Sequence, residues 1–488
     1  MSALRPQPRI FEINTWAWLH EQSAERGEPI TLVTVPSRAW DEVAATGTDA
    51  VWLMGVWERS AAGARVCREE QWLIDYGRSH LPHFSLDDIV GSPYCIRRYV
   101  PDGQVGGWEG LAVAREQLRA RGIGLILDFV PNHVAPDHPW VTEHPHFLIR
   151  GTEADLVERP REFVRSGEAI VALGRDPYFP PWPDVFQLNA FDQGLRQAAV
   201  ETLTTIGEHC DGVRCDMAML VMNDIFARTW GPWAGAPPAA EYWPTIVHEV
   251  KGRWPDMVFL AESYWDQEWA LMQQGFDYCY DKRLYERLQS GDSQNVRLHL
   301  QADVAYQARL VRFIENHDEP RANAVFSPGA IRAAAVVIST LPGATLYHQG
   351  QFEGRRLWVP VALGRLPPEP EDSTLAQLYR RLVELSGVVR QGEWWLCAVE
   401  GWPDNDSARN IVSWCWSTRE GVSVVAVNLT ATPAQGRVRL PAEAVAREVV
   451  VFTDALTGDI FERVRDDLLA EGLYVGLNGY GVHVLRDG

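Results

Sequence analysis

Three acidic residues each end an apolar stretch of the sequence. Asp216 closes DGVRCD, Glu262 closes MVFLAE, and Asp318 follows LVRFIEN. A charge at the end of a buried strand costs free energy unless it faces a solvated cleft. In a parallel barrel the carboxyl ends of all strands meet at one face, and the chemistry takes place there. The three acids therefore predict a single acidic site at that face.

Each acid also has a purely structural interpretation. Glu262 could lie in the first turn of a helix, and Asp216 or Asp318 could cap one. The neighbouring residues favour a site instead. Arg214 lies two residues before Asp216, so on a strand both side chains point to the same face and the guanidinium keeps the carboxylate ionised. His317 directly precedes Asp318.

A fourth polar strand end lies upstream, in GLILDFVPNH. Asp128, Asn132 and His133 follow the apolar run of this segment. At these four strand ends the chain resembles the α-amylase family, glycoside hydrolase family 13. Four linked motifs in the family's order are more specific than any one of them. The motifs are DFVPNH (128–133), GVRCDMAML (212–220), FLAES (259–263) and FIENHDEP (313–320).

The resemblance implies a role for each acid. Asp216 would be the nucleophile, Glu262 the general acid/base, and Asp318 a carboxylate that grips the sugar in the first subsite. In SPYCIRRY (92–99), Tyr99 would be the ring stacked under that sugar and Tyr94 a nearby wall residue. The alternative is a turn with two packed tyrosines. The other residues that the resemblance places around the sugar are His133, Arg214, His317 and Asp128.

These residue types fit the chemistry on their own. Cleaving an acetal with retention needs one carboxylate that attacks the anomeric carbon and one protonated carboxyl, roughly 5 Å apart. Asp216 beside Arg214 suits the ionised role. Glu262 follows Phe259 and Leu260, and an apolar setting would raise its pKa and keep it protonated.

Composition narrows the class of partner. The chain has 488 residues, more than the roughly 250 of a single barrel, so insertions and a second domain are expected. Its 45 Lys and Arg against 65 Asp and Glu give a net charge of −20, which argues against nucleic acid and anionic membranes. The net charge does not oppose the binding of a neutral carbohydrate. Oligomeric state stays open.

Cysteine usage indicates a reducing compartment. The seven cysteines form no CxxC pair, so neither a disulfide framework nor a zinc site is predicted. The first residues lack the apolar core of a signal peptide, and no run approaches 18 apolar residues. We expect a cytoplasmic protein without a membrane span.

Strand candidates alternate with amphipathic stretches over the first 350 residues. Leu111, Ala114 and Leu118, for instance, keep helical spacing within 108–122. This alternation predicts a (β/α)8 TIM barrel. The strand candidates are 10–16, 50–56, 123–130, 211–216, 257–262, 276–280, 310–316 and 344–348.

Two segments interrupt the alternation. Residues 133–192, rich in Pro, His and aromatics, are too long for an ordinary loop and predict a small inserted subdomain after strand three, where the family places its domain B. Short alternating runs after a helix near 373–390 predict a C-terminal all-β sandwich domain at 391–488. The barrel would comprise 1–132 and 193–390.

Some positions depart from the family's pattern. Met217 follows the predicted nucleophile, which leaves linkage preference open, and Met219 and Leu220 replace a Lys-His pair that binds the leaving glucan in many members. Arg98 stands where several exo-acting members carry an acid. Asn132 coincides with a structural calcium ligand of many members, whose other ligands would come from the insert, where Asp137, Asp176 and Asp184 are candidates. No cofactor is required for catalysis.

The sequence therefore predicts a retaining α-glycosidase, of the α-glucosidase type, that acts on a small α-glucoside or short oligosaccharide. A transglycosylase or isomerase that uses the same glucosyl-enzyme is one alternative. A non-catalytic sugar-binding or scaffold relative is another, and the complete set of three acids argues against it. A metal-dependent isomerase on the same barrel is a third, disfavoured because the acids and histidines form no ligand cluster.

Overall fold

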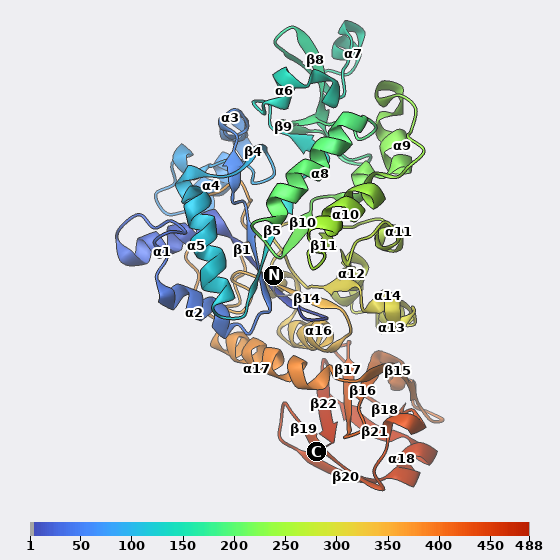
Figure 1. The fold of residues 1–488 in the computed structure, drawn as a ribbon. Helices are drawn as coiled ribbons and strands as arrows, with labels where there is room; N and C mark the ends of the chain where they lie inside the picture. Colours follow the sequence, from blue (N-terminus) through green and yellow to red (C-terminus); the bar gives the residue numbers. More distant parts are fainter. Residues whose placement is uncertain (1–3, 488) are drawn as a thin grey trace. The chain divides into compact units, whose positions relative to one another are not determined.

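The computed structural model describes residues 4–487, and eight parallel strands close into a barrel within them (Figure 1). This confirms the predicted fold class. Each strand lies within a few residues of its predicted range. In barrel order the strands are β1 (Arg9–Asn14), β2 (Ala50–Met54), β5 (Gly124–Phe129), β10 (Gly212–Cys215), β11 (Val258–Ala261), β12 (Tyr278–Tyr280), β13 (Leu310–Arg312) and β14 (Ala344–His348).

The barrel strands are buried on both faces. Every residue of β2 and of β14 is buried. Strands covered by helices outside and packed side chains inside read as continuous apolar runs rather than alternating ones. This is why short runs such as AVWLM form strands in this chain.

Helix α5 (Gly107–Arg119) buries the apolar stripe that its sequence predicts. Its buried residues include Leu111, Ala114 and Leu118, the helical spacing expected from the sequence. No helix of the described residues is long and apolar enough to cross a membrane. The other helices are α1 (Thr15–Arg26), α2 (Ser37–Ala45), α3 (Ala61–Glu69), α4 (Gln71–His80), α6 (Trp140–Glu143), α7 (Glu153–Glu158), α8 (Gln193–Gly207), α9 (Asn223–Ala234), α10 (Tyr242–Arg253), α11 (Glu268–Gln273), α12 (Lys282–Ser290), α13 (Ser293–Leu300), α14 (Val304–Gln307), α15 (Ala322–Val325), α16 (Pro328–Thr340), α17 (Ser373–Val389) and α18 (Arg465–Glu471).

The chain divides into two compact units. The first comprises the residues up to Tyr280 together with Trp358–Pro368, and it contains the barrel strands β1 to β12. Two loops of this unit carry their own structure. The loop after β2 forms the hairpin β3 (Trp57–Arg59) and β4 (Ile96–Pro101), with α3 and α4 between its strands.

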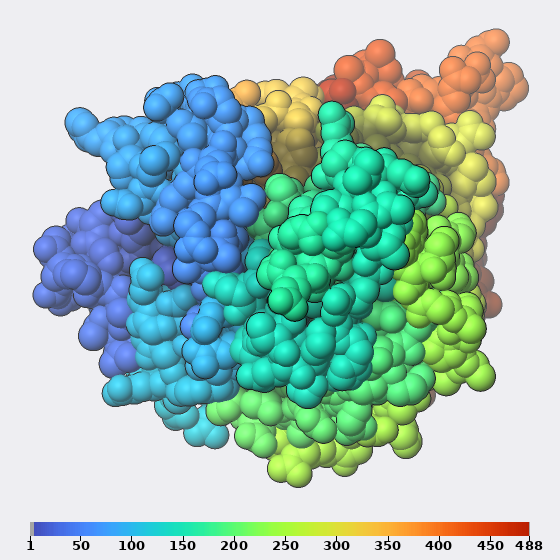
Figure 2. Space-filling view, turned by 90° about the horizontal axis from the view of Figure 1, so that it is seen from above, coloured from blue at the N-terminus to red at the C-terminus, as the bar shows by residue number. Residues whose placement is uncertain are grey.

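The long loop after β5 is the second of these. It forms an antiparallel four-stranded sheet in the order β6 (His133–Val134), β9 (Trp182–Gln187), β8 (Ala169–Gly174) and β7 (Phe163–Ser166). Phe147, Val171 and Phe186 belong to its own small core. Strand β9 packs against α3, and Figure 2 shows this insert, in blue-green, next to the blue segment that carries α3 and α4.

The second unit comprises Asp281–Leu357 and the residues from Glu369 on. Its antiparallel sheet has the order β20, β19, β22, β17, β16, β15, β18, β21. Val450 of β19 and Val475 of β21, near opposite edges of that order, share one core cluster, so the sheet folds back on itself. The strands are β15 (Glu393–Glu400), β16 (Ile411–Ser417), β17 (Val422–Asn428), β18 (Ala434–Arg439), β19 (Val449–Asp454), β20 (Ile460–Val464), β21 (Leu473–Leu477) and β22 (Val482–Asp487).

Candidate active site

Strand β10 lies between β5 and β11, and its register brings three polar strand ends together. Arg214 is opposite Asp128 of β5. One residue beyond the strand, the Asp216 amide donates to the Phe129 carbonyl. The Glu262 amide in turn donates to the Cys215 carbonyl. The backbone pairing of three parallel strands therefore places Asp128, Asp216 and Glu262 side by side.

The Arg214 guanidinium binds all three carboxylates. Its Nη1 lies 2.7 Å from Asp216 Oδ1 and 3.4 Å from Asp128 Oδ1. Its Nη2 lies 2.7 Å from Glu262 Oε2. The Arg214 side chain is 0% exposed. A planar guanidinium with its fixed fork of donors suits this bridging position better than an ammonium would.

Burial and the carboxylates act on Arg214 in opposite directions. Burial by itself lowers the pKa of Arg214, but Glu262 and Asp216 raise it well above its usual value. Arg214 therefore stays charged. Because its charge is buried with theirs, it favours the ionised forms of Asp216 and Glu262.

Glu262 has a more polar environment than its sequence neighbours suggest. Its side chain is buried, yet Oε2 also accepts a 2.7 Å hydrogen bond from the Met217 amide, and Oε1 accepts one of 2.8 Å from the Tyr264 hydroxyl. These donors and Arg214 favour the carboxylate, which corrects the expected apolar setting. Met217 has φ 41°, which is a strained backbone conformation for a residue other than glycine. In this conformation the Met217 amide points at Glu262.

The two tyrosines of SPYCIRRY have different surroundings. The Arg214 guanidinium carbon lies 5.0 Å from the centroid of the Tyr94 ring. The Tyr99 hydroxyl instead exchanges hydrogen bonds with the Val130 backbone, while its ring packs against Trp57 and Phe129. Tyr94 was expected to line the wall of the sugar site. The face of its ring lies against the Arg214 guanidinium, which binds the carboxylates.

His133 begins the insert at the edge of this site. Its side chain is buried, and this burial lowers its pKa to about 3, so the ring is neutral at physiological pH. A neutral imidazole can both donate to and accept from a sugar hydroxyl. Its ring centroid lies 5.2 Å from that of Trp182 in β9, which ties His133 to the insert.

The remaining predicted site residues belong to the second unit. His317 Nε2 lies 3.0 Å from Asp318 Oδ2, and the Asp318 side chain is 44% exposed. The Asn316 side chain accepts hydrogen bonds from the amides of Asp318 and Glu319. This turn fixes the direction in which the chain leaves β13. The role of Asp318 and His317 stays a prediction.

Among the positions that depart from the family's pattern, Met217 binds Glu262 through its amide, whereas Met219 and Leu220 lie in the core. Met219 is 0% exposed and Leu220 2% exposed. Neither can contact a leaving group in this conformation. Arg98 pairs with Glu58 on the β3–β4 hairpin, at 2.7 Å.

The residues named as calcium ligands do not form a common donor set. Asn132 Oδ1 accepts from the Gln187 side chain at 2.9 Å. Asp137 binds Ser60, and the Asp176 side chain accepts from the amides of Tyr178 and Phe179. Within residues 4–487 no group of three or more His, Cys, Asp and Glu side chains could hold a metal. Because Asn side chains and backbone carbonyls can also bind Ca²⁺, structural calcium stays a prediction.

Two side chains of the site were not predicted. The Tyr264 hydroxyl binds Glu262, and the same two-residue spacing that linked Arg214 to Asp216 could have indicated it. Trp52 of β2 donates to Asp128 Oδ2 at 3.1 Å, and the Arg214 guanidinium carbon lies 5.0 Å from the centroid of its ring. Nothing in the sequence near Trp52 links it to residues on other strands.

No family model matches the chain. Among proteins of known function, the α-amylase MalA of Haloarcula japonica is 24% identical over 326 residues, which cover 65% of this chain and 40% of that protein. The 1,4-α-glucan branching enzyme GlgB of Burkholderia pseudomallei (strain 668) is 25% identical over 228 residues, 44% of this chain and 27% of the enzyme. The matches thus span less than half the length of these relatives.

The fold has similar solved structures. A maltogenic α-amylase, AmyB, from Thermotoga neapolitana superposes with a TM-score of 0.69 at 17% sequence identity, covering 98% of this chain and 97% of AmyB. Barrel, insert and C-terminal sheet are therefore aligned over nearly the whole length of both chains.

Proposed function

Because the chain belongs to the α-amylase family, glycoside hydrolase family 13, we propose that it cleaves α-glucosidic bonds by a double displacement on Asp216 and Glu262. The observation that carries this proposal is the sharing of one buried guanidinium by both carboxylates. That sharing holds them as close neighbours, compatible with the spacing of roughly 5 Å that a retaining mechanism needs.

Each carboxyl then has one role. Asp216 attacks the anomeric carbon, and the bond from that carbon to the leaving oxygen breaks as Glu262 donates its proton to that oxygen. Water next gives a proton to Glu262 and attacks the same carbon, which frees Asp216. Tyr94, above Arg214, is the better placed ring to lie against the sugar, while His133 and Asp318 would bind its hydroxyls.

Glu262 must carry a proton before the first step. Its three donors favour the carboxylate, so protonation needs the arrival of the substrate to displace or weaken at least one of them. Tyr264 is the donor able to leave, since Arg214 is held by two other carboxylates and the Met217 amide is part of the backbone.

We propose a small α-glucoside or short oligosaccharide as the substrate. The burial of Met219 and Leu220 supports this, because these positions offer a long leaving glucan no polar contact. Comparing kcat/KM on di- and trisaccharides with that on soluble starch is the test. A clear preference for starch would contradict the proposal.

Transfer to a sugar acceptor is the second candidate, since one relative is a branching enzyme. Incubation with α-glucosides that differ in linkage and aglycone, followed by chromatography, separates hydrolysis from transfer. Proton NMR of the first-formed sugar tests the mechanism in the same experiment. We expect the α-anomer; a β-anomer before mutarotation would exclude double displacement.

We also propose a cytoplasmic location. All seven cysteines are buried, and their odd number without a CxxC pair suits a reducing compartment. Fractionation of the producing cells tests this.

A further inference from the structure

We propose that Tyr178 and Trp265 form an aromatic corner that stacks on the sugar ring on the leaving-group side of Glu262. This inference rests on the proposed function and adds to it the residues that recognise the leaving or accepting sugar. The occupant is an uncharged pyranose ring, whose C–H face packs on an aromatic ring. The two residues come from the insert and from the loop after β11.

Tyr178 lies in the turn between β8 and β9. It is 63% exposed, which is unusual for an aromatic side chain. The turn is nevertheless well fixed, because Asp176 Oδ1 accepts hydrogen bonds from the Tyr178 and Phe179 amides at 2.6 and 2.9 Å. Pro177, Pro180 and Pro181 restrict the backbone further. The sequence thus holds an exposed ring in a defined place.

Trp265 lies three residues beyond Glu262 and is only partly buried. Trp265 has φ 60° and Asp266 has φ 61°. Two consecutive non-glycine residues in the left-handed region store strain that the surrounding contacts must hold. The Gln267 side chain donates to the Trp265 carbonyl at 3.0 Å, and the Gln267 amide donates to the Tyr264 carbonyl. The strained turn gives the Trp265 ring its direction.

The two rings meet at 4.8 Å between centroids and 76° between planes. One ring can therefore lie against the face of a sugar while the other lies along its edge. Aromatic pairs in proteins favour such edge-to-face geometry, but they are normally buried. Here the exposed face of Tyr178 leaves room for a ligand.

The corner connects to the catalytic groups at both of its ends. Tyr264, the residue before Trp265, binds Glu262 through its hydroxyl. Trp182, at the other end of the turn that carries Tyr178, lies 5.2 Å from His133 between ring centroids. In the proposed mechanism Glu262 protonates the leaving oxygen, and the loop after β11 that begins with Glu262 also carries Tyr264 and Trp265. Met219 and Leu220 are buried and cannot supply this contact.

The test compares two substrates that transfer the same glucosyl group. Maltotriose has a leaving sugar, whereas α-glucosyl fluoride has a leaving ion with no ring. We expect Tyr178→Ala to lower kcat/KM for maltotriose roughly 3- to 10-fold, the size of one aromatic contact, and to leave glucosyl fluoride unchanged. Tyr178→Phe keeps the ring and should retain wild-type values. Phe179→Ala, on the same turn and 67% exposed, is the matched control and should change neither substrate.

Equal losses on both substrates, or none in Tyr178→Ala, would overturn the proposal. If the wild-type enzyme turns over neither substrate, the proposed function fails. The affinity for maltotriose then tests the aromatic corner independently of activity. Quenching of tryptophan fluorescence by maltotriose would give a Kd for each variant. A Kd that rises in Tyr178→Ala but not in Phe179→Ala supports the corner, and equal Kd values exclude it. Circular dichroism checks that each variant is folded.

Discussion

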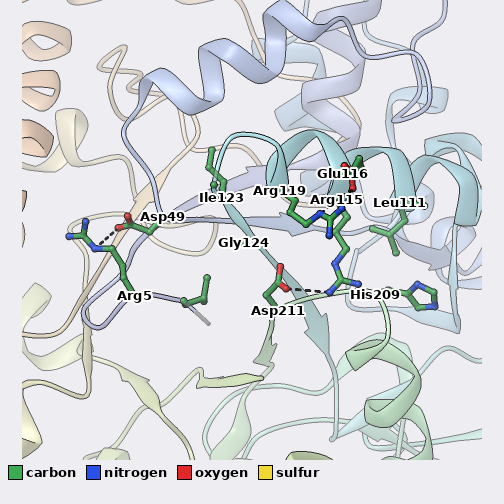
Figure 3. Close-up of a pocket in the computed structure, with 13 residues that line it drawn as sticks. Arg5, Asp49, Leu111, Arg115, Glu116, Arg119, Ile123, Gly124, His209 and Asp211 are labelled. Carbon is green, nitrogen blue, oxygen red and sulfur yellow. Dashed lines mark hydrogen bonds and ion pairs between the residues drawn. The ribbon is translucent and has the colours of Figure 1, made fainter. Parts of the chain in front are cut away.

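Arginine–aspartate pairs lie at both ends of the barrel strands, and the two ends differ in burial and in what the aspartates bind. Figure 3 shows the amino ends, where Arg115 Nη2 lies 3.3 Å from Asp211 Oδ1 and Arg5 lies 3.3 Å from Asp49 Oδ2. A cavity of about 930 Å³ opens among these residues. At the carboxyl ends, Arg214 binds Asp216, Asp128 and Glu262 without exposure to solvent.

The aspartates at the amino ends accept hydrogen bonds from backbone amides at the starts of strands. Asp211 Oδ2 accepts from the Leu125 amide at 2.9 Å, and Asp49 Oδ2 accepts from the Arg9 amide at 2.8 Å. Each thus satisfies a donor at the start of a strand, and its arginine is partly exposed. At the carboxyl ends three carboxylates share one buried cation. The cavity with charged walls thus lies among aspartates that serve the backbone, whereas the buried charges at the carboxyl ends are those that the proposed mechanism uses.

The largest expected effect is a loss of activity on substitution at the carboxyl end of β10 but not at its amino end. Asp216→Asn should lower kcat/KM by roughly 10³-fold or more, because the amide cannot attack the anomeric carbon. Asp211→Asn, at the other end of the strand, keeps an acceptor for the Leu125 amide and should leave the rate near that of the wild type. Steady-state kinetics on one α-glucoside measures both. Activity of Asp216→Asn close to wild type would remove Asp216 as the nucleophile.

The arginines should differ in stability. Arg214→Met leaves buried carboxylates without their cation and should lower the free energy of unfolding by about 3–5 kcal/mol. Arg115→Met removes a partly exposed pair and should cost about 1 kcal/mol or less. Urea unfolding measures both variants. Similar losses would mean that the two ends of the strands are electrostatically equivalent.

Acid sensitivity is expected to come from His133. Burial lowers the pKa of His133 from 6.5 to about 3. Between these values the unfolded chain binds a proton that the folded one does not, so stability falls as pH falls. At pH 5 this amounts to about 2 kcal/mol. His133→Gln should remove that pH dependence, as seen in melting temperatures from pH 7 to pH 4.

His209, which lines the cavity of Figure 3, provides the comparison. Burial also lowers its pKa, but the ring is partly exposed, so His209→Gln should change the pH dependence less. An equal or larger change in the pH dependence of the melting temperature in His209→Gln would contradict the prediction that the more deeply buried His133 causes the acid sensitivity.

The smallest effect concerns Tyr264. Tyr264→Phe removes one donor to the Glu262 carboxylate and so disfavours its ionised form. The alkaline limb of the pH–rate profile should move to higher pH, by about one unit or less, the size of one hydrogen bond. Tyr99→Phe, whose hydroxyl binds the Val130 backbone, should leave the limb in place. A shift to lower pH in Tyr264→Phe would contradict the role of Tyr264.

The barrel and most of the carboxylate cluster could be predicted from the sequence. Apolar runs at regular intervals specify parallel strands, and the carboxyl ends of such strands meet at one face. Asp128, Arg214, Asp216 and Glu262 therefore had to come close together, because each stands at the end of such a run. The spacing of Arg214 and Asp216 was enough to predict their contact.

Only the tertiary structure decided how the loops complete this cluster. Trp52 lies against Arg214, Tyr94 rather than Tyr99 has its ring at that guanidinium, and Tyr178 meets Trp265. Met219 and Leu220, which stand where many members carry a Lys-His pair, are buried. The period and ends of a strand are set by neighbours in the sequence, so the sequence determines them directly. Contacts between loops depend on residues far apart in the chain, which packing alone brings together.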